Sequence, residues 1–185
     1  MPSLAPTRPG RASQGDDNAE QVRWSPGGCD GGLERADDVG GASPEAVVAA
    51  PNKEALFTSP DPLLNANKQV VYHIMRDLLE ANNWDKADQF LTERYIQHNP
   101  NVPSGRDTVV RFFTEVLKLQ PTPIPETLKT PVVFVSAEGD LVTVATVRTE
   151  KDPRDATKTY TTTRYDTRRI VDGKADEHWD SAVKQ

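Results

Sequence analysis

The clearest structural signal in the chain is the stretch TYTTTRYDTRRIVDGKADEHWDSAV, residues 159–183. Threonine, tyrosine, valine and isoleucine are typical of strands, and the pair Asp172-Gly173 is a strong signal for a two-residue hairpin turn. We therefore expect a long strand over residues 159–171 and a final strand over residues 174–183, joined by this turn and paired antiparallel.

The segment before this hairpin has the same period of two. Residues 132–135 are Val-Val-Phe-Val, and residues 141–149 are rich in valine and threonine. A turn sequence, Ala-Glu-Gly-Asp over residues 137–140, separates them. We expect two further strands here, followed by a polar loop over residues 151–158.

Nearer the N-terminus the apolar period changes to that of a helix. Apolar residues recur at i, i+3 and i+4 spacing over residues 70–79, which predicts a helix of about four turns. Asn65 or Asn67 is expected to cap its start. Trp84 begins a short second helix in which the apolar residues up to Leu91 share one face.

A third helix is expected after a short strand or extended loop over residues 92–100. Pro100 disfavours helix at the residue before it, and Ser104 then begins the helix with Asp107 as an approximate capping box. Helices therefore precede antiparallel strands, which predicts the α+β class. A curved sheet wrapped around a helix layer would leave a cavity between the two layers.

Composition divides the chain at about residue 63. Residues 1–63 hold 8 of the 11 glycines and 8 of the 15 prolines, and their 5 basic and 10 acidic side chains give a net charge of −5. Residues 64–185 carry 17 basic and 18 acidic side chains, a net charge of −1. Too little apolar surface is available in the first segment to offset the entropy of ordering. We expect a disordered acidic extension over residues 1–63 and one domain over residues 64–185.

Several functional classes are disfavoured by composition. The net charge of −6 argues against nucleic acid or an anionic membrane as a partner, and no apolar stretch reaches the ~18–20 residues of a membrane span. The single cysteine, Cys29, cannot form an internal disulfide or a multi-cysteine zinc site. No metal-binding spacing or phosphate-binding glycine loop occurs, so we expect no metal and no cofactor. No secretory signal is readable, which predicts a cytoplasmic protein.

Two passages are more specific than these patterns. Residues 95–100 read Tyr-Ile-Gln-His-Asn-Pro and are followed by Ser-Gly-Arg at residues 104–106. Residues 166–174 read Asp-Thr-Arg-Arg-Ile-Val-Asp-Gly-Lys and lead into Glu-His-Trp-Asp at residues 177–180. Together with the order of elements, they resemble the SnoaL-like polyketide cyclase family of the nuclear transport factor 2-like superfamily. The resemblance covers about residues 64–185.

The resemblance implies a cone-shaped fold, in which three helices close a curved antiparallel sheet around an apolar pocket. It also implies a homodimer, packed through the outer face of the sheet. The founding cyclases close a ring by intramolecular aldol condensation without metal or cofactor, using an aspartate on a strand as general acid and base. Asp166 matches that position. The superfamily also contains isomerases, dehydratases and epoxide hydrolases, so fold alone does not settle function.

Asp166 is the strongest candidate for a catalytic residue. An aspartate inside a strand is disfavoured by propensity, and in a dry pocket its pKa would rise toward the range useful for proton abstraction. Alternation places Arg164 and Arg168 on the same face of the strand. These two guanidinium groups would instead keep Asp166 ionised and lower its pKa, or would bind an anionic substrate or an enolate oxygen. The sequence leaves these interpretations open.

Further candidates come from the two motifs. His98 is placed near the pocket by the resemblance, where it could polarise a carbonyl oxygen, or it could fix the loop beside Asn99. Asn99 is itself a candidate substrate-binding residue or a turn residue. Tyr95 could supply a phenolic donor or be part of the core. His178 could reach the cavity or the dimer interface, and Trp179 is expected in the core or the pocket wall.

Two hypotheses from different classes follow. The first is a cofactor-independent acid/base enzyme (an aldol-type cyclase, an isomerase or a hydrolase-like enzyme) that acts on a small carbonyl compound through Asp166, His98 and His178. The second is a non-catalytic small-molecule-binding or dimerisation module on the same fold. A buried Asp166 with a raised pKa beside a cavity would favour the enzyme, and an exposed ladder of Arg164, Asp166 and Arg168 would favour the module.

Overall fold

The computed structural model describes residues 45–184. The expected disorder of the acidic extension up to residue 44, and Cys29 within it, lie outside the described residues. Within residues 45–184, no helix combines the length and the apolar composition needed to cross a lipid bilayer.

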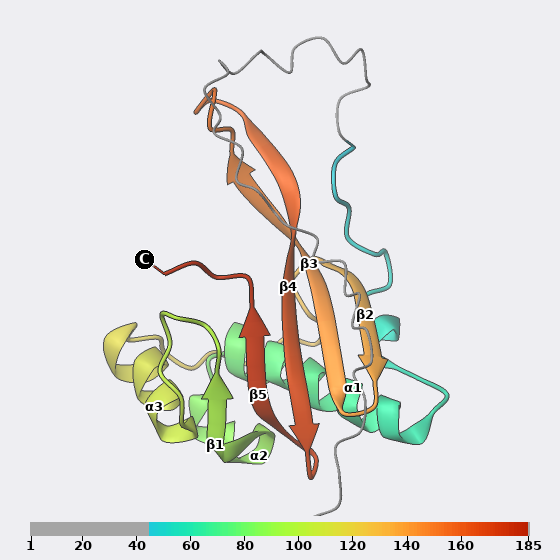
Figure 1. Cartoon of the computed structure of the whole chain (residues 1–185), viewed down its shortest axis with the longest axis vertical. Helices are drawn as coiled ribbons and strands as arrows, with labels where there is room; N and C mark the ends of the chain where they lie inside the picture. The colour runs from blue at the N-terminus through green and yellow to red at the C-terminus, as the bar shows by residue number, and fades with distance from the viewer. Residues whose placement is uncertain (1–44, 185) are drawn as a thin grey trace, which may run out of the picture. The chain divides into compact units, whose positions relative to one another are not determined.

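One five-stranded sheet forms one layer of the domain, with the strand order β1-β5-β4-β3-β2 (Figure 1). The strands are β1 (Leu91–Gln97), β2 (Val132–Glu138), β3 (Leu141–Lys151), β4 (Thr159–Val171) and β5 (Lys174–Asp180). All neighbouring strands are antiparallel except β1 and β5, which are parallel. The last strand in chain order therefore occupies an inner position, between the first strand and β4.

The turn between β4 and β5 forms where the sequence predicts it. Asp172 and Gly173 both have positive φ angles, 49° and 75°, which is the backbone of the tight hairpin turns favoured by Asp-Gly pairs. The predicted limits of β4 are confirmed, whereas β5 ends at Asp180, three residues earlier than expected. β3 and β4 pair as far as Lys151 and Thr159 and extend beyond the other strands (Figure 1).

The first helix begins earlier than the apolar spacing predicts. α1 spans Pro62–His73 and continues without a break as a π-helical segment, Ile74–Glu80. Its cap is Asp61, whose Oδ1 accepts a hydrogen bond from the Leu64 amide at 3.0 Å, so the expected cap at Asn65 or Asn67 is wrong. Asp61 is favoured because Pro62 needs no hydrogen-bond acceptor for its nitrogen at the first helical position.

The second and third helices are short. A 3-10 turn, Trp84–Lys86, leads into α2 (Ala87–Phe90), and α3 (Arg106–Arg111) continues as a π-helical segment, Phe112–Val116. The expected capping box at Ser104 is wrong, because Gly105 precedes the helix with a φ of 95° and no side chain caps it. The Ser104 hydroxyl instead accepts a hydrogen bond from the Gln97 amide at 3.0 Å, which ties the loop to the end of β1.

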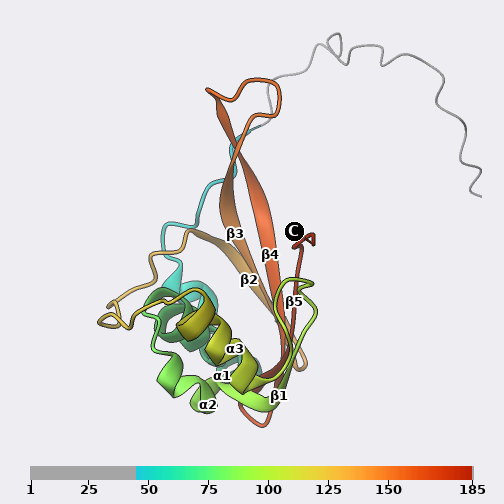
Figure 2. The same ribbon diagram turned by 90° about the vertical axis from the view of Figure 1, so that its left-hand side faces the viewer.

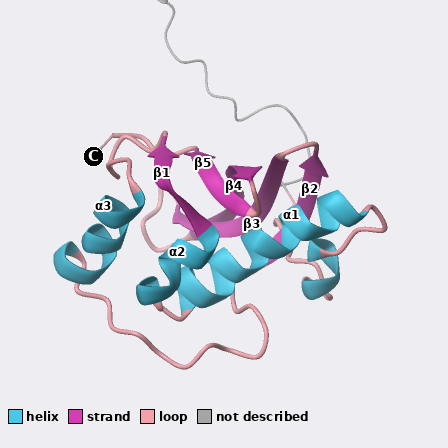
Figure 3. Cartoon of the chain, turned by 90° about the horizontal axis from the view of Figure 1, so that it is seen from below, coloured by secondary structure: helices cyan, strands magenta, loops and turns pink. Residues whose placement is uncertain are grey.

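The helices lie on one face of the sheet, and the core fills the space between the two layers (Figures 2 and 3). The largest fully buried side chains are Phe57, Leu78, Leu91, Leu128, Val71, Val109, Val132, Val142 and Val144. The α+β class and the curved sheet covered by helices are confirmed. The sheet does not close into a barrel, because β1 and β2 remain at its two edges.

The boundary expected at residue 63 falls inside the folded unit. Glu54–Phe57 form a short 3-10 helix, and the Phe57 side chain is completely buried against α1, with its ring 5.3 Å from that of Tyr72. The Ala50 amide donates to the Val132 carbonyl at 2.8 Å. Composition missed this segment because one buried aromatic residue is sufficient to anchor it among residues that are otherwise polar or small.

Phe57→Ala is therefore expected to lower the free energy of unfolding by about 3–5 kcal/mol, the usual cost of removing a buried phenylalanine side chain. Denaturant unfolding followed by circular dichroism measures this change. Val48→Ala, at an exposed position of the same segment, is the control and should stay within about 0.5 kcal/mol. Equal stability of Phe57→Ala and the wild type would place residues 45–57 outside the cooperative unit.

Candidate functional site

A cavity of about 120 Å³ lies between the sheet and the helices. Its apolar wall comes from the helices and includes Leu78, Trp84 and Phe113, and its polar wall comes from the strands. A second hollow of about 350 Å³ is lined by some of the same residues, including Phe113 and Asp166. The expected pocket is therefore present, with apolar groups on one side and charged groups on the other.

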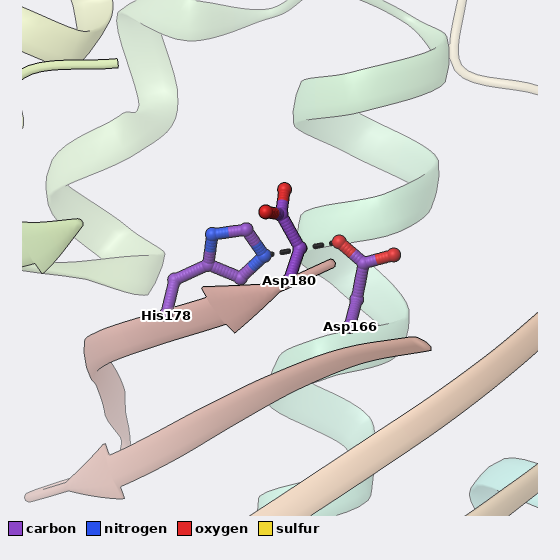
Figure 4. A group of neighbouring side chains, drawn as sticks. All are labelled: Asp166, His178 and Asp180. Atoms are coloured by element: carbon purple, nitrogen blue, oxygen red, sulfur yellow. Dashed lines mark hydrogen bonds and ion pairs between the residues drawn. The ribbon is translucent and has the colours of Figure 1, made fainter. Parts of the chain in front are cut away.

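The register of β4 and β5 explains which polar side chains reach the cavity. Asp166 pairs with Asp180, and Arg168 pairs with His178, so these four residues face the helices from adjacent strands. Arg164 lies on the same face, as the alternation predicts. Figure 4 shows that Asp166, His178 and Asp180 approach one another above the two strands.

His178 connects β1, β5 and β4 through both of its ring nitrogens. Its Nε2 lies 3.0 Å from Asp166 Oδ1, and its Nδ1 lies 2.8 Å from Gln97 Oε1. An ionised carboxylate only accepts hydrogen bonds, so Nε2 donates to Asp166 in both the neutral and the protonated imidazole. Nδ1 donates to the Gln97 oxygen only when His178 is protonated, and in the neutral form it accepts from the Gln97 amide after that amide rotates.

Arg164 links the two carboxylates of the site. Its Nε lies 3.3 Å from Asp166 Oδ2, and its Nη2 lies 3.0 Å from Asp180 Oδ2. The Asp180 side chain is almost completely buried and also accepts a hydrogen bond from the Asn99 amide at 2.8 Å. One guanidinium group thereby bridges the two carboxylates and reduces the repulsion between their negative charges.

Tyr95 and Arg168 form the innermost part of the site. Both side chains are buried and line the cavity, and they are hydrogen-bonded to each other. Burial raises the pKa of the Tyr95 hydroxyl, although the charge and hydrogen bond of Arg168 oppose this effect, so Tyr95 remains a proton donor. Within residues 45–184, Nε and Nη1 of Arg168 have no hydrogen-bond partner.

The charges around Asp166 and His178 set their protonation. Burial alone raises the pKa of the Asp166 carboxyl, but the hydrogen bond from His178 and the charges of Arg168 and Arg164 lower it below its usual range. Burial and then the charge of Arg168 lower the pKa of His178, and Asp166 only partly offsets them. At neutral pH Asp166 is therefore ionised and His178 is neutral. Stability consequently falls on acidification, since unfolding releases both groups to bind protons more readily.

Asp166, His178 and Asp180 are also the residues that could hold a metal ion, since one ligand atom from each lies within 4.8 Å of the others (Figure 4). Two carboxylates and an imidazole are a reasonable donor set. Arg164 already binds both carboxylates, and the charge of Arg168 acts on His178. These two cations oppose a bound metal ion, so the site is better suited to organic groups.

The structure separates two of the expected site residues from the others. His98 is exposed, lies 3.1 Å from Glu177 and stacks on Trp179, with 4.8 Å between ring centroids. Glu177 and Trp179 alternate with His178 and Asp180 along β5, and the side chains of His98, Glu177 and Trp179 line neither of the two hollows. The remaining expected residues, Tyr95, Asn99, Arg164, Asp166, Arg168 and His178, line the cavity together.

Two residues of the site were not selected from the sequence. Gln97 and Asp180 both face the cavity, Gln97 from β1 and Asp180 from β5. The period of two contains a signal for Asp180, because it is two residues after His178. Gln97 is likewise two residues after Tyr95, but the sequence left Tyr95 open between pocket and core, and which face of β1 meets the cavity depends on its parallel pairing with β5.

Asp166→Asn is expected to lower the pKa of His178 further, because the carboxylate that favours the imidazolium form is removed. An NMR titration of the histidine side chains measures this pKa, and the His178 signal is assigned by its loss in His178→Gln. Asp172→Asn, in the turn at the end of the same strand, is the matched control and should leave the pKa unchanged. An unchanged or raised pKa in Asp166→Asn would contradict the coupling of the two groups.

Comparison with known proteins places this chain in a family. The profile of the SnoaL-like domain matches residues 72–178, and no match was found among curated proteins. The fold is similar to three solved structures from bacteria. A candidate SnoaL-like polyketide cyclase from Jannaschia sp. CCS1 is 17% identical, with 67% of this chain and 91% of that chain covered and a TM-score of 0.43.

TsrD from Streptomyces laurentii is 18% identical, with 66% and 90% of the two chains covered and a TM-score of 0.42. An NTF2-like protein of unknown function from Burkholderia pseudomallei K96243 is 14% identical, with 64% and 91% covered and a TM-score of 0.45. The profile match spans more than half of the chain and includes β1, β4 and the part of β5 that ends at His178. The chain therefore belongs to the family of SnoaL-like domain proteins.

Proposed function

We propose that this protein is a cofactor-independent acid/base catalyst that acts on a small, partly apolar carbonyl compound. The observation that carries the proposal is the hydrogen bond between His178 and Asp166 at the wall of a cavity between sheet and helices. A carboxylate that is ionised, fixed in direction and removed from bulk water is the arrangement required of a general base.

Asp166 is the proposed base. Its Oδ1 is engaged by His178, and Oδ2 faces Arg164 at 3.3 Å, so the carboxylate is fixed on both sides. It would remove a proton from the carbon next to the carbonyl group of the substrate. Its lowered pKa makes it a weaker base than an isolated buried carboxylate, so the substrate proton must be acidic or the enolate must be stabilised strongly.

His178 and Tyr95 are the proposed partners of the base. Neutral His178 holds Asp166 in place by donating through Nε2, and the contact of Nδ1 with the Gln97 side chain fixes the orientation of the imidazole ring. The Tyr95 hydroxyl stays protonated and can donate to a substrate oxygen. The role expected for His98 has no support in this geometry, because His98 stacks on Trp179 away from the cavity.

Proton removal by Asp166 can begin several reactions. The enolate can attack a second carbonyl group and close a ring, or it can take a proton at another carbon and isomerise a double bond. Activation of a water molecule by the same carboxylate would give hydrolysis. A cavity of about 120 Å³ admits only a small molecule or one part of a larger one, which the adjoining hollow would extend.

A non-catalytic binding module is the second candidate, and one observation favours it. Arg164 and Arg168 keep Asp166 ionised and lower its pKa, which reduces its strength as a base. The cavity would then bind a small molecule without changing it. Proton exchange at the carbonyl compound distinguishes the two functions.

The proposal also includes a homodimer formed through the outer face of the sheet. Phe134 on β2 and Tyr165 on β4 are both exposed, and their rings are 6.2 Å apart. Ala145 on β3 pairs with both residues and lies between them. Ala145 is itself buried, so the exposed rings of Phe134 and Tyr165 form the apolar patch on the face of the sheet opposite Asp166, of the kind that marks a protein interface.

Wild-type protein is expected to accelerate the exchange of α-protons of acetophenone or cyclohexanone in D2O, followed by proton NMR. Asp166→Asn should lower the rate above buffer by about 10²–10⁴-fold, the usual contribution of a general base. Asp172→Asn is the control and should retain the wild-type rate. Exchange at the rate of buffer alone, together with measurable ketone binding, would favour the non-catalytic module.

Tyr165→Glu is expected to convert a dimer into a monomer, because a charge would be placed in the apolar patch. Sedimentation equilibrium should change from about twice the chain mass of 20.4 kDa to that mass. Tyr160→Glu is a matched control, since Tyr160 and Tyr165 are on the same strand and are 48% and 47% exposed. A monomeric wild type, or a dimer in both variants, would disprove this interface.

A further inference from the structure

Arg168 is a buried cation whose charge no carboxylate contacts. The residue is 3% exposed, and no ion pair among residues 45–184 includes it. Its Nε and Nη1 have no hydrogen-bond partner in that part of the chain, and its polar contact is with Tyr95. A guanidinium group without a counter-ion in a low-dielectric site is costly, so most buried arginines are paired.

The acidic groups of the site do not relieve this cost. Asp180 contacts Arg164 and Asn99, and Asp166 contacts Arg164 and His178. Asp166 acts on Arg168 only through its charge. Arg164 therefore serves two carboxylates, whereas Arg168 is left with a neutral phenol.

The position of Arg168 makes a ligand the natural partner. Arg168 lines both the 120 Å³ cavity and the adjoining hollow, and it faces the same space as Asp166. Trp84 in the apolar wall has a second buried donor, Nε1, without a partner among the described residues. The unsatisfied groups of this cavity are thus all donors, which call for an acceptor and not for a metal ion.

We infer that the cavity binds an organic anion, with the anionic oxygen on Arg168 and the apolar body against Trp84 and Phe113. The ligand class is a carbonyl compound that carries a carboxylate or an ionised enol. A neutral carbonyl oxygen would satisfy one N–H group but would leave the charge of Arg168 without a counter-ion. An anion supplies both the hydrogen-bond acceptor for the N–H groups and the counter-ion for the charge of Arg168.

This inference deepens the proposed function, on which it rests for the identity of the substrate as a carbonyl compound. If Asp166 removes a proton, negative charge develops on the carbonyl oxygen of the substrate. Arg168 is the cationic donor of the site with unpartnered N–H groups to receive that oxygen, and its charge is in place before the reaction begins. The anion on Arg168 and the proton on Asp166 would then be held on adjacent parts of one wall.

Benzoate is a suitable probe because its ring is close in size to the cavity, and apolar cavities of about 150 Å³ are known to admit benzene. Benzamide has nearly the same shape without the charge. Titration of the ¹⁵N-labelled full chain by NMR gives a Kd for each compound. We expect benzoate to bind at least about tenfold more tightly than benzamide, as a charged acceptor on a buried guanidinium should.

Arg168→Met should remove this preference, so that the two compounds bind with similar Kd values. Arg169→Met is the matched control, because Arg169 is the next residue on β4 but pairs with Asp140 and Glu177 outside the cavity. It should retain the preference for benzoate. Arg168→Met is also expected to melt no lower than the wild type without ligand, since an apolar group replaces a buried cation without an ion pair.

Three results would overturn the inference. They are equal binding of benzoate and benzamide by the wild type, no detectable binding of benzoate at 10 mM (about the weakest Kd such a titration measures), and an unchanged preference in Arg168→Met. The comparison on the wild type needs no variant, so a folding defect cannot hide the outcome. The measurement does not require turnover, and loss of proton exchange with benzoate binding intact would reject the proposed function alone.

Discussion

The antiparallel pairing of β4 with β5 is the interaction on which the site depends. The Asp172-Gly173 turn and the register shift that follows it, between Ile170 and Arg169, together place Asp166 opposite Asp180 and Arg168 opposite His178. A slip of β5 by one residue would move His178 and Asp180 to the outer face of the sheet, away from Asp166 and Arg168. The turn and the register shift therefore determine the chemistry of the cavity as well as the topology of the hairpin.

The arrangement of charges in the cavity is costly for the folded state and useful for ligand binding. Two carboxylates, two guanidinium groups and a histidine replace apolar groups that would stabilise the fold better at the same positions. Arg164 offsets the two carboxylates, while Arg168 is incompletely paired. A site with such a residue holds an unpaired positive charge in place before any ligand binds. A ligand that carries a negative charge then supplies the counter-ion that the protein does not.

Local patterns predicted the elements of the fold well and their exact ends less well. The period of two gave β4 and its turn correctly, because each strand residue faces either the core or solvent. Asp61 and Gly105 were missed as helix starts, since several polar residues near each start could serve as caps. Phe57 was missed because its burial depends on α1, which lies later in the chain.

The sequence predicted the part of the site that lies on a single strand, β4. Arg164, Asp166 and Arg168 share a face because they alternate within β4. The pKa of Asp166 is lowered against the effect of burial, first by the hydrogen bond from His178 and then by the charges of Arg168 and Arg164, so the interpretation based on the two arginines gave the right direction but not the main cause. The other interpretation, a raised pKa, is wrong for this site.

Pairing between distant strands was not predictable in the same way. Whether His98 or Gln97 faces the cavity depends on how β1 meets β5, and that contact joins residues about 80 positions apart.

The inner position of β5 has a consequence for the order of folding. The strands β1 and β4 cannot be joined into one sheet until β5, the last strand in chain order, lies between them. Closure of so long a loop is slow, so the contact of His178 with Gln97 forms late in folding, after the local contact of His178 with Asp166 within the hairpin. A partly folded chain would hold its helices and outer hairpins before it possessed a binding site.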